Sequence, residues 1–151
     1  MGLDVSHDCW HGAYSAFMRW REKLAEVAGL PPLTLMEGFY KQGEPCTDPV
    51  WEAKYAPEDK FRKWRDIQGG LPIKWNALKP DVLYELLYHS DCEGELDVKI
   101  LLPLAKRLEE LIPLLPDGDG GGNIGIWKEK TKQFAKGLRA AAKKKQRVTF
   151  R

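Results

Sequence analysis

Apolar side chains recur at helical spacing in several parts of the chain, and this periodicity constrains the fold more than any other feature. The first run covers residues 8–28, at Trp10, Tyr14, Phe17, Leu24 and Ala28. This spacing predicts an amphipathic helix. Ser6 or Asp8 is placed to cap its start, and Gly29 with the prolines that follow is a stop signal.

Four further stretches have helical patterns: 57–67, 80–89, 97–115 and 131–145. Pro80 suits the first position of its helix. The segments LDV (3–5) and RVTF (147–150) have the side chains of short strands, and we expect them to pair with each other. The sequence therefore predicts an α-rich α+β fold of four to five helices, with a minimal sheet formed by the N- and C-terminal segments.

Length and composition predict one domain, 1–151. Of the 151 residues, 43% are hydrophobic and 30% are charged, which is typical of a globular chain able to bury its own core without a disulfide or a metal. Residues 30–79 contain six of the ten prolines and several aromatic residues. We therefore expect an irregular insertion there, packed by aromatic side chains and suited to act as a lid.

Several features predict a cytoplasmic protein with no membrane association. No run approaches the roughly 20 apolar residues that span a bilayer, and the opening MGLDVSHD has neither a basic start nor an apolar stretch. The three cysteines are an odd number, which argues against a disulfide framework and for a reducing compartment. The oligomeric state stays open, a homo-oligomer included.

Positive charge is concentrated at the C-terminal end. Residues 136–151 contain seven cations and no acid; since the whole chain carries +2, residues 1–135 carry −5. Such a stretch is either an anion-binding patch or a solvated helix end whose cations suit the negative end of the helix dipole. We favour the second interpretation and do not expect nucleic acid as a partner.

Two segments hold reactive side chains out of proportion to their length: SHDCWH (6–11) and HSDCEGE (89–95). They contain all three histidines of the chain and two of its three cysteines. Each is predicted to lie at the mouth of a helix, where unpaired backbone N–H groups and the positive dipole end favour anions. We expect the two segments to meet in space and form one polar pocket.

This pocket admits more than one chemistry. His7, His11, His89 and Asp91 are candidate metal ligands, with His7 and His11 four residues apart on one helix face, but the spacing fits no established zinc pattern. Cys9 or Cys92 beside a histidine is a candidate nucleophile. We therefore expect no cofactor, with a divalent metal as the open alternative.

The acidic residues Asp91, Glu93 and Glu95 alternate in the second segment. They either hold a hard cation or serve in acid–base chemistry, or they end one helix and cap the next. The sequence leaves these readings even. The glycine-rich stretch at 116–123 lacks the residues of a phosphate-binding or calcium loop and predicts a flexible connection.

Three stretches, GLDVSHDCWHGAYSAFMRWR, YHSDCEGEL and KTKQFAKGLRAAAKKKQRVTFR, resemble a group of small proteins found in bacteriophages and bacteria. The resemblance covers residues 2–29, 80–116 and 131–150. In that group an aspartate is usual where Glu93 stands here, which weakens any strict metal geometry at this position. The resemblance implies a shared fold and pocket and a phage or prophage origin, but no activity.

Some small phage proteins counter bacterial defence by sequestering nucleotide messengers, and the residues here are compatible with that role. Trp10 and one tryptophan of the insertion are expected to stack on a base, and Arg19 and Arg21 to hold phosphate. We therefore predict a non-enzymatic protein that binds a small polar ligand such as a nucleotide. The predicted ligand-binding residues are His7, Asp8, Trp10, His11, Tyr14, Arg19, His89, Ser90, Asp91, Glu93 and Glu95.

Two alternatives belong to other classes. A metal-dependent hydrolase would use the same pocket, with Asp91 or Glu93 as general base and a metal-bound water as nucleophile. A protein-interaction module would use both segments only to cap helices, and its basic C-terminal end would contact an acidic partner. Metal content, turnover and the effect of removing the C-terminal cations separate the three classes.

Overall fold

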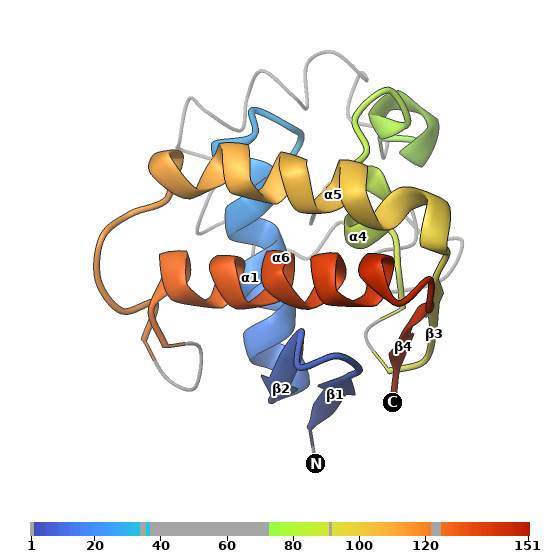
Figure 1. The fold of residues 1–151 in the computed structure, drawn as a ribbon. Helices are drawn as coiled ribbons and strands as arrows, with labels where there is room; N and C mark the ends of the chain where they lie inside the picture. The colour runs from blue at the N-terminus through green and yellow to red at the C-terminus, as the bar shows by residue number, and fades with distance from the viewer. Residues whose placement is uncertain (1, 34–35, 37–72, 91, 122–124) are drawn as a thin grey trace, which may run out of the picture.

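A computed structural model describes residues 2–33, 36, 73–90, 92–121 and 125–151. Three long helices dominate it: α1 (Tyr14–Val27), α5 (Val98–Leu111) and α6 (Trp127–Lys143). The short helix α4 (Tyr84–Leu87) and the 3-10 turns η2 (Trp75–Leu78) and η3 (Ile112–Leu114) complete the described helical part. Helices α5 and α6 run side by side in opposite directions and cross α1 (Figure 1).

A small antiparallel sheet lies against these helices. Its strands are β1 (Leu3–Val5), β2 (Trp10–Gly12), β3 (Gly94–Leu96) and β4 (Val148–Phe150), in the order β2-β1-β4-β3. The predicted pairing of the two terminal segments is confirmed, since Val5 lies opposite Phe150. The α-rich α+β class is confirmed too, but the sheet holds two strands that the sequence analysis did not predict, β2 and β3.

One face of the sheet packs on the helices and the other faces solvent. Leu3, Val5, Val148 and Phe150 are buried, whereas Asp4 between the first two is exposed, as the alternation of a half-covered strand requires. On the covered side the rings of Trp10, Phe17, Trp20 and Phe134 form the centre of the core. The Trp10 ring centroid lies 5.2 Å from those of both Phe17 and Trp20.

Helix α1 begins six residues later than predicted. Residues 6–9 form the turn between β1 and β2, in which His7 and Asp8 have left-handed backbone conformations with φ of 59° each. Ala13 is the N-cap residue of α1, so the expected caps at Ser6 and Asp8 are wrong. Trp10 fitted the helical spacing but lies on a strand. It is apolar at that position because it packs into the same core as Phe17 and Trp20.

Of the other predicted helices, two are confirmed and one is shorter than predicted. Helix α5 with η3 confirms 97–115, and Asp97 caps it by accepting a hydrogen bond from the Lys99 backbone N–H at 3.0 Å. Helix α6 confirms 131–145 but begins earlier, and 80–89 shortens to α4. The predicted helix at 57–67 lies outside the described residues. Within the described ranges, no helix is long and apolar enough to cross a membrane.

Candidate functional site

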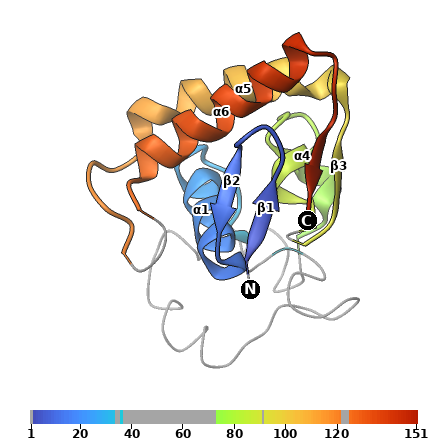
Figure 2. The same cartoon turned by 60° about the horizontal axis from the view of Figure 1, so that its bottom comes forward.

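The two reactive segments lie on opposite edges of the sheet. The first segment forms the β1–β2 turn and most of β2, and the second leads into β3 (Figure 2). Strands β1 and β4 lie between them. The first segment therefore precedes a strand and not a helix, and the expected pair of facing helix mouths does not form.

His7 joins the β1–β2 turn to the end of α6. Its Nε2 donates to Oε1 of Gln146 at 2.8 Å, and its Nδ1 accepts from the Ser6 hydroxyl at 2.9 Å. The Ser6 oxygen in turn accepts from the backbone N–H of Thr149 at 2.9 Å. This network uses both ring nitrogens and suits a neutral imidazole, which has one donor and one acceptor.

His11 lies on the solvent-facing side of the sheet, between two carboxylates. Its Nδ1 contacts Asp4 on the neighbouring strand, and its Nε2 donates to Asp8 in the turn at 2.7 Å. Carboxylate oxygens only accept, so both contacts are hydrogen bonds only when the imidazole is protonated. Since His7 lies in a turn and His11 on a strand, the expected shared helix face does not exist.

His89 is held at the opposite edge of the sheet. Its ring stacks on Phe150 with the ring centroids 4.1 Å apart, and its Nδ1 and Nε2 lie 2.7 and 3.2 Å from the backbone oxygens of Ser90 and Glu95. A Cβ atom on Gly94 would be only 3.0 Å from this ring. Glycine at 94 thus lets the histidine lie against β3.

The buried Arg21 stabilises the chain that leads into the second segment. It is 2% exposed, and its guanidinium donates to the backbone oxygens of Leu86 at 3.3 Å and His89 at 2.5 Å. The Leu86 carbonyl lies in the last turn of α4 and the His89 carbonyl just beyond it, where backbone oxygens lack helical partners. The sequence analysis expected Arg21 to hold phosphate, but its buried guanidinium binds backbone oxygens instead. An arginine on the inner face of a helix has no distinctive spacing that would reveal this role.

The three histidines therefore have different surroundings and do not converge. Each has both ring nitrogens within hydrogen-bonding distance of a protein atom. Among the residues that the structure describes, no group of three or more His, Cys, Asp and Glu side chains could hold a metal ion. Asp91, the fourth candidate ligand, lies outside the described residues.

Cys9 packs against α6 and has the properties of a core residue. It is fully buried, and a Cβ atom on Gly137 would be 2.5 Å from its Sγ. Burial, with a smaller effect of the Asp8 charge, raises the pKa of the Cys9 thiol from 9.0 to about 12. The thiol therefore stays protonated at neutral pH and does not serve as a nucleophile. Cys92, in contrast, is exposed.

The remaining predicted site residues divide into buried and exposed groups. Trp10 is fully buried, so its ring is not available for stacking on a ligand from solvent. Tyr14 is half-buried and Arg19 exposed, both on α1. Ser90, Glu93 and Glu95 are exposed, and Glu95 accepts from the Arg147 guanidinium at 2.8 Å. The alternating acids of the second segment are thus, in part, the outward positions of β3.

An aromatic cluster beside the second segment was not predicted as a unit. It consists of Trp75 in η2, Tyr84 in α4 and Tyr88 directly after α4. The Tyr88 ring centroid lies 5.4 Å from that of Trp75 and 5.3 Å from that of Tyr84. Tyr88 is 59% exposed. Burial, with the neighbouring Tyr88 and Glu85, raises the pKa of Tyr84, so its hydroxyl stays neutral at physiological pH.

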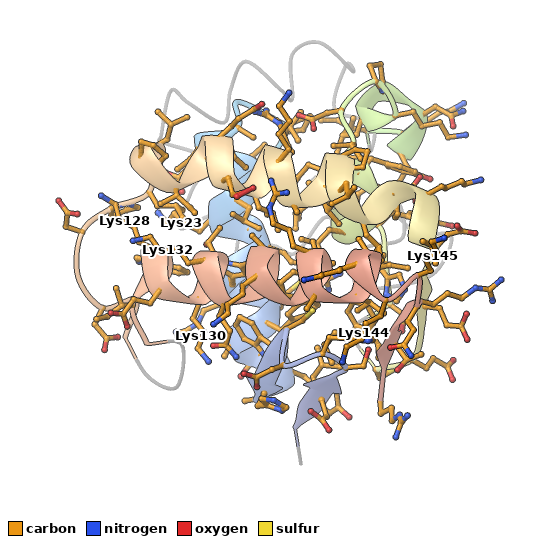
Figure 3. The ribbon with its side chains drawn as sticks, in the orientation of Figure 1. Lys23, Lys128, Lys130, Lys132, Lys144 and Lys145 are labelled. Carbon is orange, nitrogen blue, oxygen red and sulfur yellow. The ribbon has the colours of Figure 1, made fainter. Side chains whose placement is uncertain are left out.

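Among the residues that the structure describes, two of the seven C-terminal cations pair with acids. Arg139 pairs with Glu109 of α5, and Arg147 pairs with Glu95 of β3. Lysines lie at both ends of α6: Lys128, Lys130 and Lys132 near its start, close to Lys23 of α1, and Lys144 and Lys145 at its end (Figure 3). Two of the seven C-terminal cations thus have a structural role, which fits neither of the two earlier interpretations completely.

The chain was compared with known protein families, curated proteins and solved structures. No protein family, curated protein or solved structure matches this chain. The resemblance to the bacteriophage group therefore stays a prediction, and the function has to be inferred from the geometry.

Proposed function

We propose that this chain is a non-enzymatic binding protein for a small planar, phosphate-bearing ligand, with a nucleotide as the ligand class. The observation that carries the proposal is the aromatic cluster of Trp75, Tyr84 and Tyr88, whose outermost ring is 59% exposed. Exposed aromatic rings provide a stacking surface for a base, because every base has a π-face.

The surroundings of the cluster supply the polar groups that such a ligand needs. Lys74 and Lys79, both exposed, flank η2 and can attract phosphate. On the other side, Ser90 and Glu93 of the second segment are exposed and offer hydrogen bonds to a sugar or a base. In this proposal the second segment contributes exposed residues to the binding site, and the first segment, whose Trp10 is fully buried, contributes none.

The same geometry supports binding over hydrolysis. A hydrolase that used these histidines as metal ligands would need free imidazole nitrogens, and in the fold these nitrogens already contact Gln146, Ser6, carboxylates or backbone oxygens. The resemblance to bacteriophage proteins supports a biological role in sequestering a nucleotide messenger of bacterial defence. Sequestration without turnover requires that the bound ligand be recovered intact.

Calorimetric titration with a panel of mononucleotides, dinucleotides and cyclic nucleotides tests the proposal. Tyr88→Ala should weaken binding of the best ligand about tenfold or more, since stacking on one ring contributes about 1–3 kcal/mol. Leu114→Ala is the matched control, because Leu114 is also 59% exposed but lies in η3. The proposal is wrong if both variants bind equally well, or if the ligand is turned over in a reaction that a chelator abolishes.

A further inference from the structure

Cations form a stripe along the exposed side of α6. Lys132, Lys136, Arg139 and Lys143 are all exposed and follow one another at intervals of four, three and four residues. With about 3.6 residues per turn, these positions lie within an arc of about 60° and extend over about 17 Å of helix. Lys132 and Lys144 lie at opposite ends of α6 (Figure 3), so the charge covers the length of the helix.

Most of this charge has no acidic partner in the described part of the chain. Residues 130–151 contain nine cations and no acid. Acids from other elements pair with two of the nine: Glu109 of α5 with Arg139, and Glu95 of β3 with Arg147. The two pairs engage arginines, so the charge that the stripe presents to solvent comes from its lysines.

The helix dipole accounts only for the C-terminal part of the stripe. Cations are favourable in the last turn, where Lys143 lies, but the effect falls off within that turn. Lys132 lies in the second turn of α6 and Lys136 in its middle. Like charges four residues apart on a helix, such as those of Lys132 and Lys136, repel each other. A solvated helix end therefore does not explain the stripe, whereas a bound polyanion would relieve this repulsion.

Lys145 adds a separate observation at the end of the stripe. It follows the C-cap residue Lys144 and has a left-handed backbone conformation with φ of 54°. Glycine is the usual residue at this position, because it adopts a positive φ without strain. The Lys145 side chain is exposed, so packing does not compensate for the strain. What the side chain contributes there is charge.

We propose that Lys132, Lys136, Lys143, Lys144 and Lys145 bind the phosphate backbone of a nucleic-acid duplex without regard to its sequence. A lysine ammonium group is a point charge that suits phosphate oxygens. Each phosphate that a lysine neutralises releases condensed counterions, which is the main source of sequence-independent affinity for a duplex. A straight helix places these charges at regular intervals, as a row of phosphates requires.

The side chains near the stripe that could read bases are engaged within the fold. Base edges are read mainly by arginine, asparagine and glutamine. Arg139 and Arg147 pair with glutamates. Gln133 and Gln146 both form hydrogen bonds with the β1–β2 turn. The lysines are left for an external ligand, and contacts with phosphates position a protein on a duplex but do not specify a sequence.

The composition of this surface favours a duplex over other anionic partners. Protein interfaces are depleted in lysine and have an apolar or aromatic centre, and single strands bind largely by stacking on aromatic rings. The exposed large apolar side chains of the described chain all precede α6. The stripe offers neither an apolar centre nor a stacking surface. It also shares no residue with the aromatic cluster of η2 and α4, so this proposal does not depend on the nucleotide site.

Fluorescence anisotropy of a labelled DNA duplex of about two helical turns and mixed sequence tests the proposal. The logarithm of the binding constant should fall linearly with the logarithm of the salt concentration, with a slope of about −4 for five lysines. Lys136→Gln/Lys143→Gln should weaken binding about tenfold at about 0.1 M salt and reduce the slope by about two. Lys74→Gln/Lys79→Gln is the matched control, because it removes the same charge from exposed lysines that flank η2.

Lys145→Gly separates binding from stability. It removes a cation and relieves the strained backbone, so it should weaken duplex binding severalfold while the thermal midpoint stays the same or rises. Absence of binding at low salt, or equal weakening in the two double variants, overturns the proposal. Tighter binding of a single strand than of the duplex overturns it as well. Polyglutamate that displaces the labelled duplex at a lower charge concentration than unlabelled duplex does would identify an acidic protein as the partner instead.

Discussion

The two reactive segments share serine, histidine, aspartate and cysteine but have different roles in the fold. In the first, Cys9 packs on Gly137, His7 binds Gln146, and the Asp8 backbone oxygen accepts from Gln133, so the segment fixes α6 on the sheet. In the second, His89 is held against Phe150 while its neighbours Tyr88, Ser90 and Cys92 are exposed. Identical side chains therefore indicate function only where the fold leaves them accessible.

The largest expected effect comes from the contact that fixes the first segment. In Gly137→Ala, the new Cβ would be 2.8 Å from the His7 backbone oxygen as well as 2.5 Å from Cys9 Sγ, so the turn and α6 must separate. We expect a loss of about 3 kcal/mol in the free energy of unfolding, measured by urea denaturation. Lys136→Ala, on the exposed side of α6, should change it by less than about 0.5 kcal/mol; equal effects would show that this contact is not tight.

The corresponding substitution in the second segment should cost less. Gly94 has φ of 110°, which an alanine adopts only with strain, and its Cβ would press on the His89 ring, which can shift. We expect Gly94→Ala to lose about 2 kcal/mol in the same assay. A loss larger than that of Gly137→Ala would contradict the view that the second segment is the less constrained of the two.

The two cysteines should differ in reactivity and in their dependence on pH. In a Cys46→Ser background, a disulfide reagent should label Cys92 in the native protein and Cys9 only after unfolding, because Cys9 is buried and Cys92 exposed. The folded protein keeps the Cys9 thiol protonated up to about pH 12, whereas the unfolded chain ionises near 9.0. Stability contributed by the protonated thiol is therefore complete below pH 9 and is lost above it.

This loss should amount to about 1.4 kcal/mol per pH unit above pH 9. Thermal or urea unfolding of the wild type and of Cys9→Ala between pH 8 and 11 measures it, since the variant lacks this contribution but keeps all other titrating groups. Parallel pH profiles for the two proteins, or rapid native labelling of Cys9, would show that the first segment opens readily to solvent.

The smallest effect concerns the exposed histidine of the first segment. His11→Ala removes contacts with Asp4 and Asp8, whose side chains are 65% and 80% exposed, so we expect a loss below about 1 kcal/mol that shrinks at high salt. His89→Ala, which removes a ring stacked on Phe150, should lose about 2 kcal/mol at any salt concentration. A larger and salt-independent loss for His11→Ala would mean that this pair is more than a surface contact.

The sequence was sufficient for the long helices and for the pairing of the terminal strands. The apolar residues of α6 (Phe134, Leu138 and Ala141) are all buried, and Val148 and Phe150 alternate with Thr149 as a half-covered strand requires. The helices could be predicted because their periodicity is readable over 14 or 17 residues.

Short strands were harder to predict, because three residues do not establish a period. Glu95 is exposed and Leu96 buried, which is the alternation of β3, but the alternating acids suggested a cation site or helix caps. The position of the aromatic cluster was also not predictable. Trp75 and Tyr88 are brought into contact by the fold of the chain between η2 and α4. Such contacts depend on tertiary structure, which no local pattern records.

The order of the strands has a consequence for how the chain acquires its structure during synthesis. Strands β1 and β2 emerge first and can form their hairpin at once, but β3 reaches them only through β4. Since β4 follows every other described element, the middle of the sheet is filled last, after α5 and α6 have left the ribosome. A nascent chain stalled before Val148 would therefore hold its helices without a continuous sheet.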